Sequence, residues 1–277
     1  MSYKVIPYQI FPLGDSAITI DFGNGIDETI NKEVIARFNQ LQHHPLPGMT
    51  EAVPAYSSIT VYYDVMALKK KIPPHQTVNE RMRQQLEERL QQPVQPDQIK
   101  ERLLNIPVCY DEEFALDIQH LASIKNISVD DVIQIHTART YRVFLLGFLP
   151  GFAYMGEVDE KITMPRKSQP VKIEAGSVGI AGKQTGIYPL KSPGGWQILG
   201  RTPLKLFKAS PNPDVSGQAL PEGEASGDSE ILETFNNSPT LLRAGDRVQF
   251  YSITKNDFYE IQNSHLHPME RGLGGEV

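Results

Sequence analysis

The 277 residues suffice for two modest domains, and the shares of apolar (40%) and charged (22%) residues are ordinary for a globular protein. The formal net charge of −6 argues against a broad nucleic-acid footprint, so no nucleic-acid partner is expected. The single cysteine, Cys109, excludes an internal disulfide, and no apolar run approaches the about 20 residues that span a bilayer. We therefore expect a cytoplasmic protein with no secretory signal and no membrane partner.

The first part of the chain alternates strand-like and helix-like segments. Apolar and β-branched residues predict strands over 8–13, 17–22, 50–56 and 58–63. Apolar residues at intervals of three and four predict helices over 27–42 and 78–91. These segments predict an α+β domain of ferredoxin-like type over residues 1–96, closed by a polar, proline-containing stretch at 92–97.

The second part changes character along its length. It opens with a predicted strand at 103–110 and predicted helices at 116–124 and 128–137, and Ser128 with Asp131 resembles an N-cap signature. Closely spaced glycines and prolines then separate short apolar segments, which predicts a closed or nearly closed β-barrel. Its strands are expected at 141–146, 178–181, 187–190, 196–199, 204–207 and 241–253. The domain would span 97–277, with a mobile polar insertion at about 208–239.

Aromatic and basic side chains in this half are candidates for binding. Phe148, Phe152 and Tyr154 could form an apolar wall for a ligand or partner, or could fill the barrel mouth. Arg166 is suited to a carboxylate or phosphate, and a solvated surface position is its alternative. Trp196 follows a Pro-Gly-Gly turn and is either presented at a strand start or packed in the core.

The glycine-rich segment 175–186 resembles a phosphate cradle, because its glycines precede Lys183. It is not a Walker A loop, since Ser177 stands where glycine is required and Gln184 replaces the magnesium-binding hydroxyl residue. Glycines at the bends of a barrel explain the spacing equally well. His136 ends a predicted helix, where a lone histidine is more often a dipole partner or a core residue than a base. No histidines or cysteines have metal-site spacing, so no metal site is predicted.

Taken together, these motifs resemble the 5-oxoprolinase B-subunit family, also described as allophanate hydrolase subunit 1, which includes an inhibitor of a sporulation histidine kinase. The motifs lie in the family's order along nearly the whole chain. They are Ile106-Pro-Val-Cys-Tyr110, Ile135-His-Thr137, Gly147-Phe-Leu-Pro-Gly-Phe152, Pro165-Arg-Lys167, Ala175-Gly-Ser-Val-Gly-Ile-Ala-Gly182, Gln184-Thr-Gly-Ile-Tyr-Pro189 and Ser192-Pro-Gly-Gly-Trp196. The match is extended by Gly200-Arg-Thr-Pro203 and Leu241-Leu-Arg-Ala-Gly-Asp246, and in the first domain by Leu13-Gly-Asp-Ser16 and Pro54-Ala-Tyr-Ser-Ser58. The chain departs from the pattern in the long stretch 208–239 and at Glu174, where proline is expected.

The resemblance implies an α/β first domain and a cyclophilin-like β-barrel. It also implies that the B subunit acts with subunits A and C in the ATP-dependent cleavage of 5-oxo-L-proline to L-glutamate, with Mg²⁺ accompanying ATP and no biotin on this chain. Two alternatives are a protein inhibitor of a sensor histidine kinase and a carboxyltransferase-type subunit acting on urea- or allophanate-like amides.

Site roles are assigned on these motifs as hypotheses. The residues expected to be catalytic are His136, Lys183 and Gln184. Those expected to bind substrate are Arg166, Gly176, Ser177, Gly182, Thr185 and Trp196. Those expected to bind a partner are Phe148, Phe152 and Tyr154.

Overall fold

The structure is a computed structural model that describes residues 6–94, 101–208 and 238–264. The chain divides into two compact units, unit 1 (Met1–Glu101) and unit 2 (Arg102–Val277). The boundary expected from the sequence, between residues 96 and 97, lies outside the described residues, as do most of the insertion expected at 208–239 and the end of the chain.

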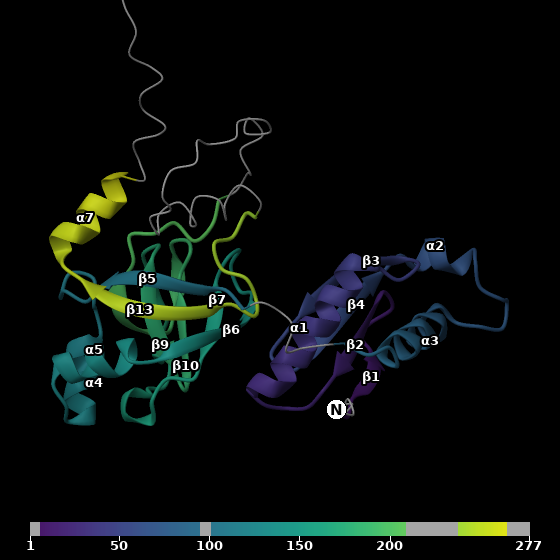
Figure 1. Cartoon of the computed structure of the whole chain (residues 1–277), viewed down its shortest axis with the longest axis horizontal. Coiled ribbons are helices and arrows are strands. Elements are labelled where there is room, and N and C mark those ends of the chain that lie inside the picture. Colours follow the sequence, from purple (N-terminus) through teal and green to yellow (C-terminus); the bar gives the residue numbers. More distant parts are fainter. Residues whose placement is uncertain (1–5, 95–100, 209–237, 265–277) are drawn as a thin grey trace, which may run out of the picture. The chain divides into compact units, whose positions relative to one another are not determined.

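In its described residues, unit 1 has a four-stranded antiparallel sheet and three helices (Figure 1). Its sheet has the order β1 (Gln9–Pro12), β2 (Ala17–Asp21), β4 (Ser58–Tyr63) and β3 (Met49–Pro54). The helices are α1 (Glu28–His43), the short α2 (Val65–Lys69), which the sequence did not predict, and α3 (Val78–Leu90). Apolar side chains of the helices pack with Ile18, Ile20, Ile59 and Val61 of the two central strands.

The ferredoxin-like assignment of this unit is wrong. That fold needs the order β-α-β-β-α-β, whereas this unit runs β-β-α-β-β-α-α. The physical reason is the hairpin between β1 and β2, in which the Leu13 amide donates to the Ala17 carbonyl at 2.9 Å. Gly14 permits this turn because its φ is +67°.

Unit 2 contains a closed barrel, which confirms the sequence-based prediction. Its strand order is β10-β7-β6-β13-β5-β12-β9, and β9 pairs with β10 to complete the closure. All neighbouring pairs are antiparallel except β13 with β5. The strands are β5 (Leu103–Cys109), β6 (Thr140–Leu146), β7 (Ala153–Gly156), β9 (Ser177–Ala181), β10 (Gln184–Ile187), β12 (Gln197–Arg201) and β13 (Arg247–Ile253).

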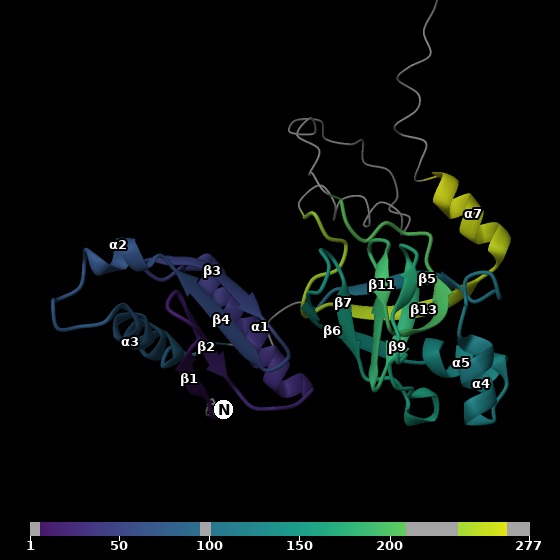
Figure 2. The same cartoon turned by 180° about the vertical axis from the view of Figure 1, so that it is seen from behind.

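The described residues of unit 2 also form helices and a small second sheet (Figure 2). They are α4 (Ile118–Lys125), α5 (Val129–Thr137), the 3₁₀ turn η2 (Glu160–Ile162), α7 (Lys255–Ser264) and the pair β8 (Val171–Ile173) with β11 (Ser192–Gly194). The N-cap predicted at Ser128 is confirmed, because its hydroxyl accepts from the Asp131 amide at 3.0 Å. The strand predicted at 204–207 is wrong, since this stretch forms only one isolated bridge, from Phe207 to Thr240.

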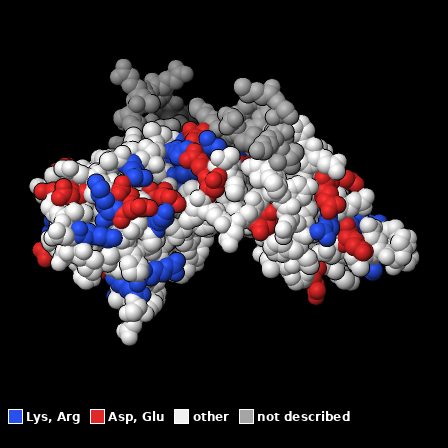
Figure 3. All heavy atoms as spheres, turned by 90° about the horizontal axis from the view of Figure 1, so that it is seen from below, with Lys and Arg blue, Asp and Glu red and all other residues white. Residues whose placement is uncertain are grey.

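Charged side chains of both signs lie intermixed on the face seen in Figure 3. None of the helices in the described ranges has the length and apolar character needed to cross a bilayer. The same residues contain no group of three or more His, Cys, Asp or Glu side chains placed to hold a metal ion.

Candidate functional site

The outer face of strands β7, β10 and β9 carries a cluster of aromatic rings. Ala153, Met155, Val178, Ile180 and Ile187 belong to the core inside the barrel. Because side chains alternate along a strand, the residues between them face outward. The rings that pack on this outer face, the aromatic platform, are Phe152, Tyr154, Tyr188 and Trp196.

The rings of the platform meet mostly edge to face. The Phe152 centroid lies 5.3 Å from that of Trp196 and 5.0 Å from that of Tyr188, with interplanar angles of 86° and 83°. The Tyr154 centroid lies 5.8 Å from that of Trp196. Such pairs fix ring orientation beyond what burial alone achieves. Three of the four rings are buried and Tyr154 is half-buried, so Tyr154 is the ring with a polar group that can reach a bound molecule.

Glycine makes room for the platform at the point where strands β9 and β10 pair. Gly179 and Gly186 stand directly opposite each other on the outer face. A Cβ at Gly186 would lie 2.9 Å from the Trp196 ring carbon Cζ3 and 3.1 Å from Cζ of Phe152. Gly186 therefore does more than permit a bend in the barrel. Because it has no side chain, the Trp196 indole can lie against the sheet.

Replacing Gly186 by alanine is expected to destabilise unit 2 by about 1–3 kcal/mol, since the added methyl group overpacks this contact. Trp196 is the single tryptophan, so its fluorescence reports both unfolding and displacement of the indole. Gly195→Ala is the matched control, because its Cβ would meet nothing closer than 3.6 Å. Equal stability of the two variants would contradict the proposed packing.

Arg166 places a cation at the edge of the platform. Its guanidinium carbon lies 6.0 Å from the centroid of the Trp196 ring, and the side chain is exposed. Neighbouring backbone fixes the loop, since the Lys167 amide donates to Gly195 O at 2.7 Å and Gln197 Nε2 donates to Pro165 O at 2.9 Å. Lys167 itself is committed elsewhere, to Asp117 at 2.6 Å. Arg166 is thus the basic residue of this motif that can meet an anion.

Gln184 and Lys183 adjoin the turn between strands β9 and β10 but differ in setting. Gln184 pairs with Gly156 while Gly186 pairs with Tyr154, so Gln184 and Tyr154 are diagonal neighbours on the outer face. Lys183 lies in the β9–β10 turn, where its ammonium stands 3.7 Å from a Glu160 carboxylate oxygen. A bridge between Met164 and Gly182 holds the Arg166 loop beside this turn. The structure therefore brings Arg166, Lys183 and Gln184 to one end of strands β9 and β10.

Burial and the nearby Arg166 shift the pKa values of the Tyr154 and Tyr188 phenols in opposite directions. Partial burial raises the pKa of Tyr154 and of Tyr188, and the Arg166 charge lowers both in part. Both phenols stay protonated at neutral pH and keep their hydrogen for donation. Arg166 and the Tyr154 hydroxyl together offer a cation and a neutral donor on one surface.

His136 lies inside the barrel core, with no exposed surface. Its Nδ1 lies 2.8 Å from the Tyr110 hydroxyl and its Nε2 lies 3.0 Å from Thr185 Oγ1, which donates to Gly179 O at 3.3 Å. A neutral ring that accepts at Nδ1 and donates at Nε2 satisfies every member of this chain. Burial lowers the pKa of His136 to about 3. His136 and Thr185 are therefore hydrogen-bonded to each other in the core of the barrel. Neither side chain lies on the outer face that carries Arg166.

The predicted backbone cradle is wrong for its two end glycines. The Gly176 amide donates to Tyr188 O at 2.7 Å, and the Gly182 amide donates to Met164 O at 2.6 Å. Between them, strand β9 pairs with β10 on one side and with β12 on the other. Ser177, at the start of this strand, is buried. Sheet closure uses these donors, so they do not converge on an anion.

Phe148 is the most exposed ring of the predicted partner-binding loop. Its side chain is 63% exposed and its φ is +68°, a left-handed value that is rare for a bulky residue. Its ring meets Phe152 edge to face at 5.8 Å, whereas Phe152 is buried. Exposed aromatic surface held by a strained backbone is typical of a binding position.

Sequence reasoning missed two residues that build this face. Tyr188 completes the platform, and its ring lies where a Cβ on Gly194 would stand. Asp117 accepts from Lys167 and from the Ile198 amide, the latter at 2.6 Å. Tyr188 had a signal in the sequence, an aromatic ring inside a glycine-rich motif, whereas nothing near Asp117 in the chain points to its partners.

A protein-family model described as "Carboxyltransferase domain, subdomain C and D" matches residues 8–215. A relative from Bacillus subtilis (strain 168), named as the B subunit of 5-oxoprolinase, is 41% identical over 258 residues, which cover 92% of this chain and 96% of that protein. A relative of the same name from Escherichia coli O157:H7 is 30% identical over 87% of this chain and 94% of its own. The chain belongs to the 5-oxoprolinase B-subunit family.

Among solved structures, the crystal structure of TTHA0988 is similar, with a TM-score of 0.64 and 32% identity. The match covers 86% of this chain and 40% of that one, so TTHA0988 extends well beyond the region they share.

Proposed function

We propose that this chain is the B subunit of an ATP-dependent 5-oxoprolinase, which opens 5-oxo-L-proline to L-glutamate together with subunits A and C. The observation that carries the proposal is the 41% identity to the B subunit of a 5-oxoprolinase over 96% of that protein's length. Coverage of this extent in both directions favours a whole subunit of the same kind over a shared domain in a different protein.

The aromatic platform suits one end of this substrate. 5-Oxoproline carries a carboxylate on a small lactam ring, and glutamate carries two carboxylates. Arg166 would bind a carboxylate, and Trp196 beneath it would limit the directions that the guanidinium can take. The Tyr154 hydroxyl and the Gln184 amide would donate to carbonyl oxygens on the same face.

ATP supplies the driving force for opening a stable amide, and Mg²⁺ would accompany it in the assembled complex.

Subunits A and C are the proposed partners, with Phe148 as an anchor on this chain. This chain alone is expected to be inactive, and the cytoplasm is its proposed location. A cyclophilin-like barrel remains the proposed finer description of unit 2.

Arg166→Ala is expected to lower kcat/KM for 5-oxoproline by about 10- to 100-fold, mainly through KM, because one charge-assisted hydrogen bond to the substrate is lost. The assay measures glutamate formed by the chain, ATP and both companion subunits. Arg166→Lys should recover little, since an ammonium lacks the planar fork. Lys172→Ala removes an exposed cation from the same unit as a control.

Wild-type kinetics of Arg166→Ala would remove Arg166 from the substrate site. A wild-type complex that consumes no 5-oxoproline would end the proposed function itself. The inhibitor of a histidine kinase and the carboxyltransferase-type subunit stay as alternatives. Recovery of a histidine kinase instead of subunits A and C would favour the first, and activity on urea-like amides would favour the second.

A further inference from the structure

The Asp117 carboxylate, at the start of helix α4, binds partners outside its own helix. An aspartate in this N-cap position ordinarily accepts a hydrogen bond from an amide of the first turn. Within the described chain, the Asp117 side chain makes no such cap bond. Its Oδ2 accepts instead from the Ile198 amide at 2.6 Å, and the Lys167 ammonium lies 2.6 Å from the same oxygen. Two partners from distant parts of the chain therefore take the place of a local cap.

Lys167 is held by the stretch 195–198 through both its side chain and its main chain. Its side chain is 18% exposed and that of Asp117 is 16% exposed, so solvent screens their ion pair only in part. A lysine is seldom buried to this degree unless its charge is paired. The carboxylate that binds the ammonium is itself bonded to Ile198, and the Lys167 amide donates to Gly195 O at 2.7 Å. The ion pair therefore ties the end of the loop 165–167 to strand β12.

Arg166 lies between two anchored peptide groups. On one side, Pro165 O accepts from Gln197 Nε2 at 2.9 Å. On the other side, the Lys167 amide is bonded to the stretch 195–198. Trp196 belongs to that stretch, and its ring centroid lies 6.0 Å from the guanidinium carbon of Arg166. Because the Arg166 side chain itself is exposed, the main chain of the loop sets the place of this cation over the indole.

We propose that Asp117 and Lys167 are positioning residues that hold Arg166 in place for the substrate carboxylate. Without their ion pair, the loop 165–167 would lose the contact that ties its end to strand β12. Arg166 would then sample more orientations, and binding a carboxylate would cost more conformational entropy. The substrate is that of the proposed function, so the inference rests on the proposed function in this respect.

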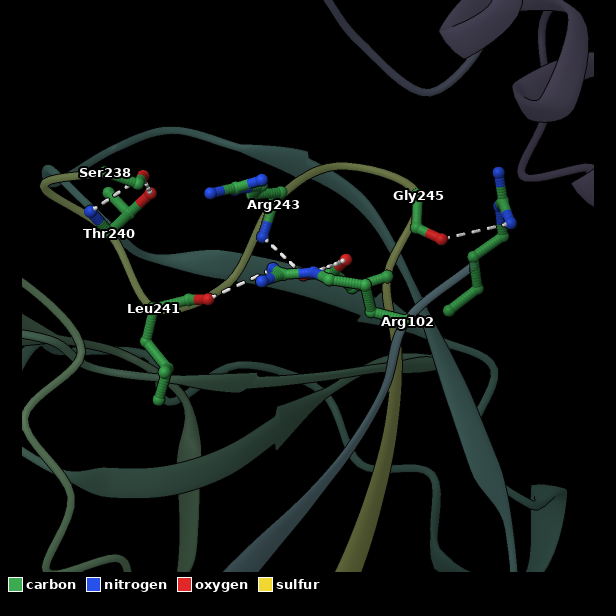
Figure 4. A network of polar contacts seen from close by, with 8 residues as sticks. Arg102, Ser238, Thr240, Leu241, Arg243 and Gly245 are labelled. Carbon is green, nitrogen blue, oxygen red and sulfur yellow. Dashed lines mark hydrogen bonds and ion pairs between the residues drawn. The ribbon is translucent and has the colours of Figure 1, made fainter. Parts of the chain in front are cut away.

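A second carboxylate of unit 2, that of Asp246, also joins a cation to a main-chain amide. It accepts from Nε and Nη2 of Arg102 at 2.9 and 2.5 Å, and from the Arg243 amide at 2.7 Å (Figure 4). Strand β13, which follows this turn, lies between β6 and β5 in the barrel, whereas the Arg166 loop adjoins the β9–β10 turn and strand β12. Asp246→Asn therefore weakens a comparable ion pair of the same unit at a place that does not hold Arg166.

Kinetics of the complex with both companion subunits test the positioning role. Asp117→Asn and Lys167→Met should each raise KM for 5-oxoproline about 3- to 10-fold with little change in kcat, the cost of ordering one side chain on binding. Lys167→Arg keeps the charge and should lose less. In the Arg166→Ala background, Asp117→Asn should raise KM no further, because it acts only through that arginine. Asp246→Asn should keep the wild-type KM.

Quenching of Trp196 fluorescence by acrylamide, in the full chain alone, tests the same role without any reaction. Trp196 is 4% exposed, and displacement of the loop should increase its quenching in Asp117→Asn and in Lys167→Met. Asp246→Asn should be quenched as the wild type is. Lys167→Met decides the question if Asp117→Asn does not fold.

Two results would overturn the positioning role. One is wild-type quenching in the variants of Asp117 and Lys167, and the other is a rise in KM that persists in full without Arg166. A wild-type complex that consumes no 5-oxoproline would end the proposed function, and the quenching measurement would still decide whether the ion pair holds the loop.

Discussion

Replacing Arg37 by alanine is expected to destabilise unit 1 by about 3–5 kcal/mol, because it breaks the buried ion pair with Glu33. Arg37 is 2% exposed, and its Nε donates to Glu33 Oε1 at 2.9 Å within helix α1. Its Nη1 reaches the end of helix α3, where it donates to Gln92 O at 2.6 Å. Arg89 of α3 returns the contact by donating to His44 O, at the end of α1, at 2.6 Å.

This exchange supplies hydrogen-bond donors to carbonyls that follow the last turn of each helix. Losing Arg37 therefore removes an ion pair and a hydrogen bond between the ends of the two helices at once. Hydrogen exchange over α1 and α3 measures the change in unit 1, while Trp196 fluorescence should show unit 2 unaffected.

Two further variants test whether the buried pair of Arg37 and Glu33 accounts for the loss of stability. The double variant Glu33→Ala with Arg37→Ala should recover part of the lost stability, because it removes both charges of the buried pair. Lys32→Ala breaks the pair with Glu28 on an exposed part of the same helix and should cost no more than about 1 kcal/mol. A loss for Arg37→Ala as small as that for Lys32→Ala would show that the buried pair does not hold the two helices together.

Local sequence patterns predicted the helices and strands that are determined by interactions between residues close together in the chain. Asp27 and Ser128 cap helices α1 and α5 through amides three residues ahead, so both helix starts could be found from the sequence. Turn-forming glycines and prolines indicated the barrel correctly. Helix α7 was missed because a single residue, Phe258, is buried along it, which leaves almost no apolar period to detect.

The site could be predicted only as a set of side chains, and their arrangement depends on strand pairing. Arg166 and Trp196 were identified separately, but their stacking requires the loop 165–167 to run beside Gly195 and Gln197. The glycine cradle failed for the same reason, since the partners of its amides come from distant parts of the chain. The strands and the two long helices of unit 1 were predicted in the observed order, and only the ferredoxin-like label, which this order does not fit, was wrong.

His136 is the clearest case of a long-range effect. Its position at the end of a helix suggested a dipole partner, a core residue or a base, and the core is where the structure places it. Tyr110, Thr185 and Phe250 enclose it from three separate parts of the chain, with the Phe250 ring stacked on the imidazole at 4.7 Å. No local pattern in the sequence indicates that these residues meet.

Acidification from pH 7 to pH 5 is expected to lower the stability of unit 2 by about 2 kcal/mol through His136 alone. The pKa of this histidine is about 3 in the folded chain and 6.5 in the unfolded chain, because burial disfavours the charged ring. The unfolded state therefore binds the proton first as pH falls. The contribution of the neutral ring is complete above pH 6.5 and declines by about 1.4 kcal/mol per pH unit towards pH 3.

Denaturant titrations followed by Trp196 fluorescence measure this slope between pH 7 and 5, above the range in which most carboxylates titrate. His136→Gln should be less stable at pH 7 but nearly independent of pH, since an amide can donate and accept without taking up a proton. His120→Gln replaces an exposed histidine and should keep the wild-type slope. If the free energy of unfolding of the wild type does not change between pH 7 and 5, the His136 ring must be able to take up a proton in the folded chain. The hydrogen-bond chain from Tyr110 through His136 and Thr185 to Gly179, which requires a neutral ring, would then be incorrect.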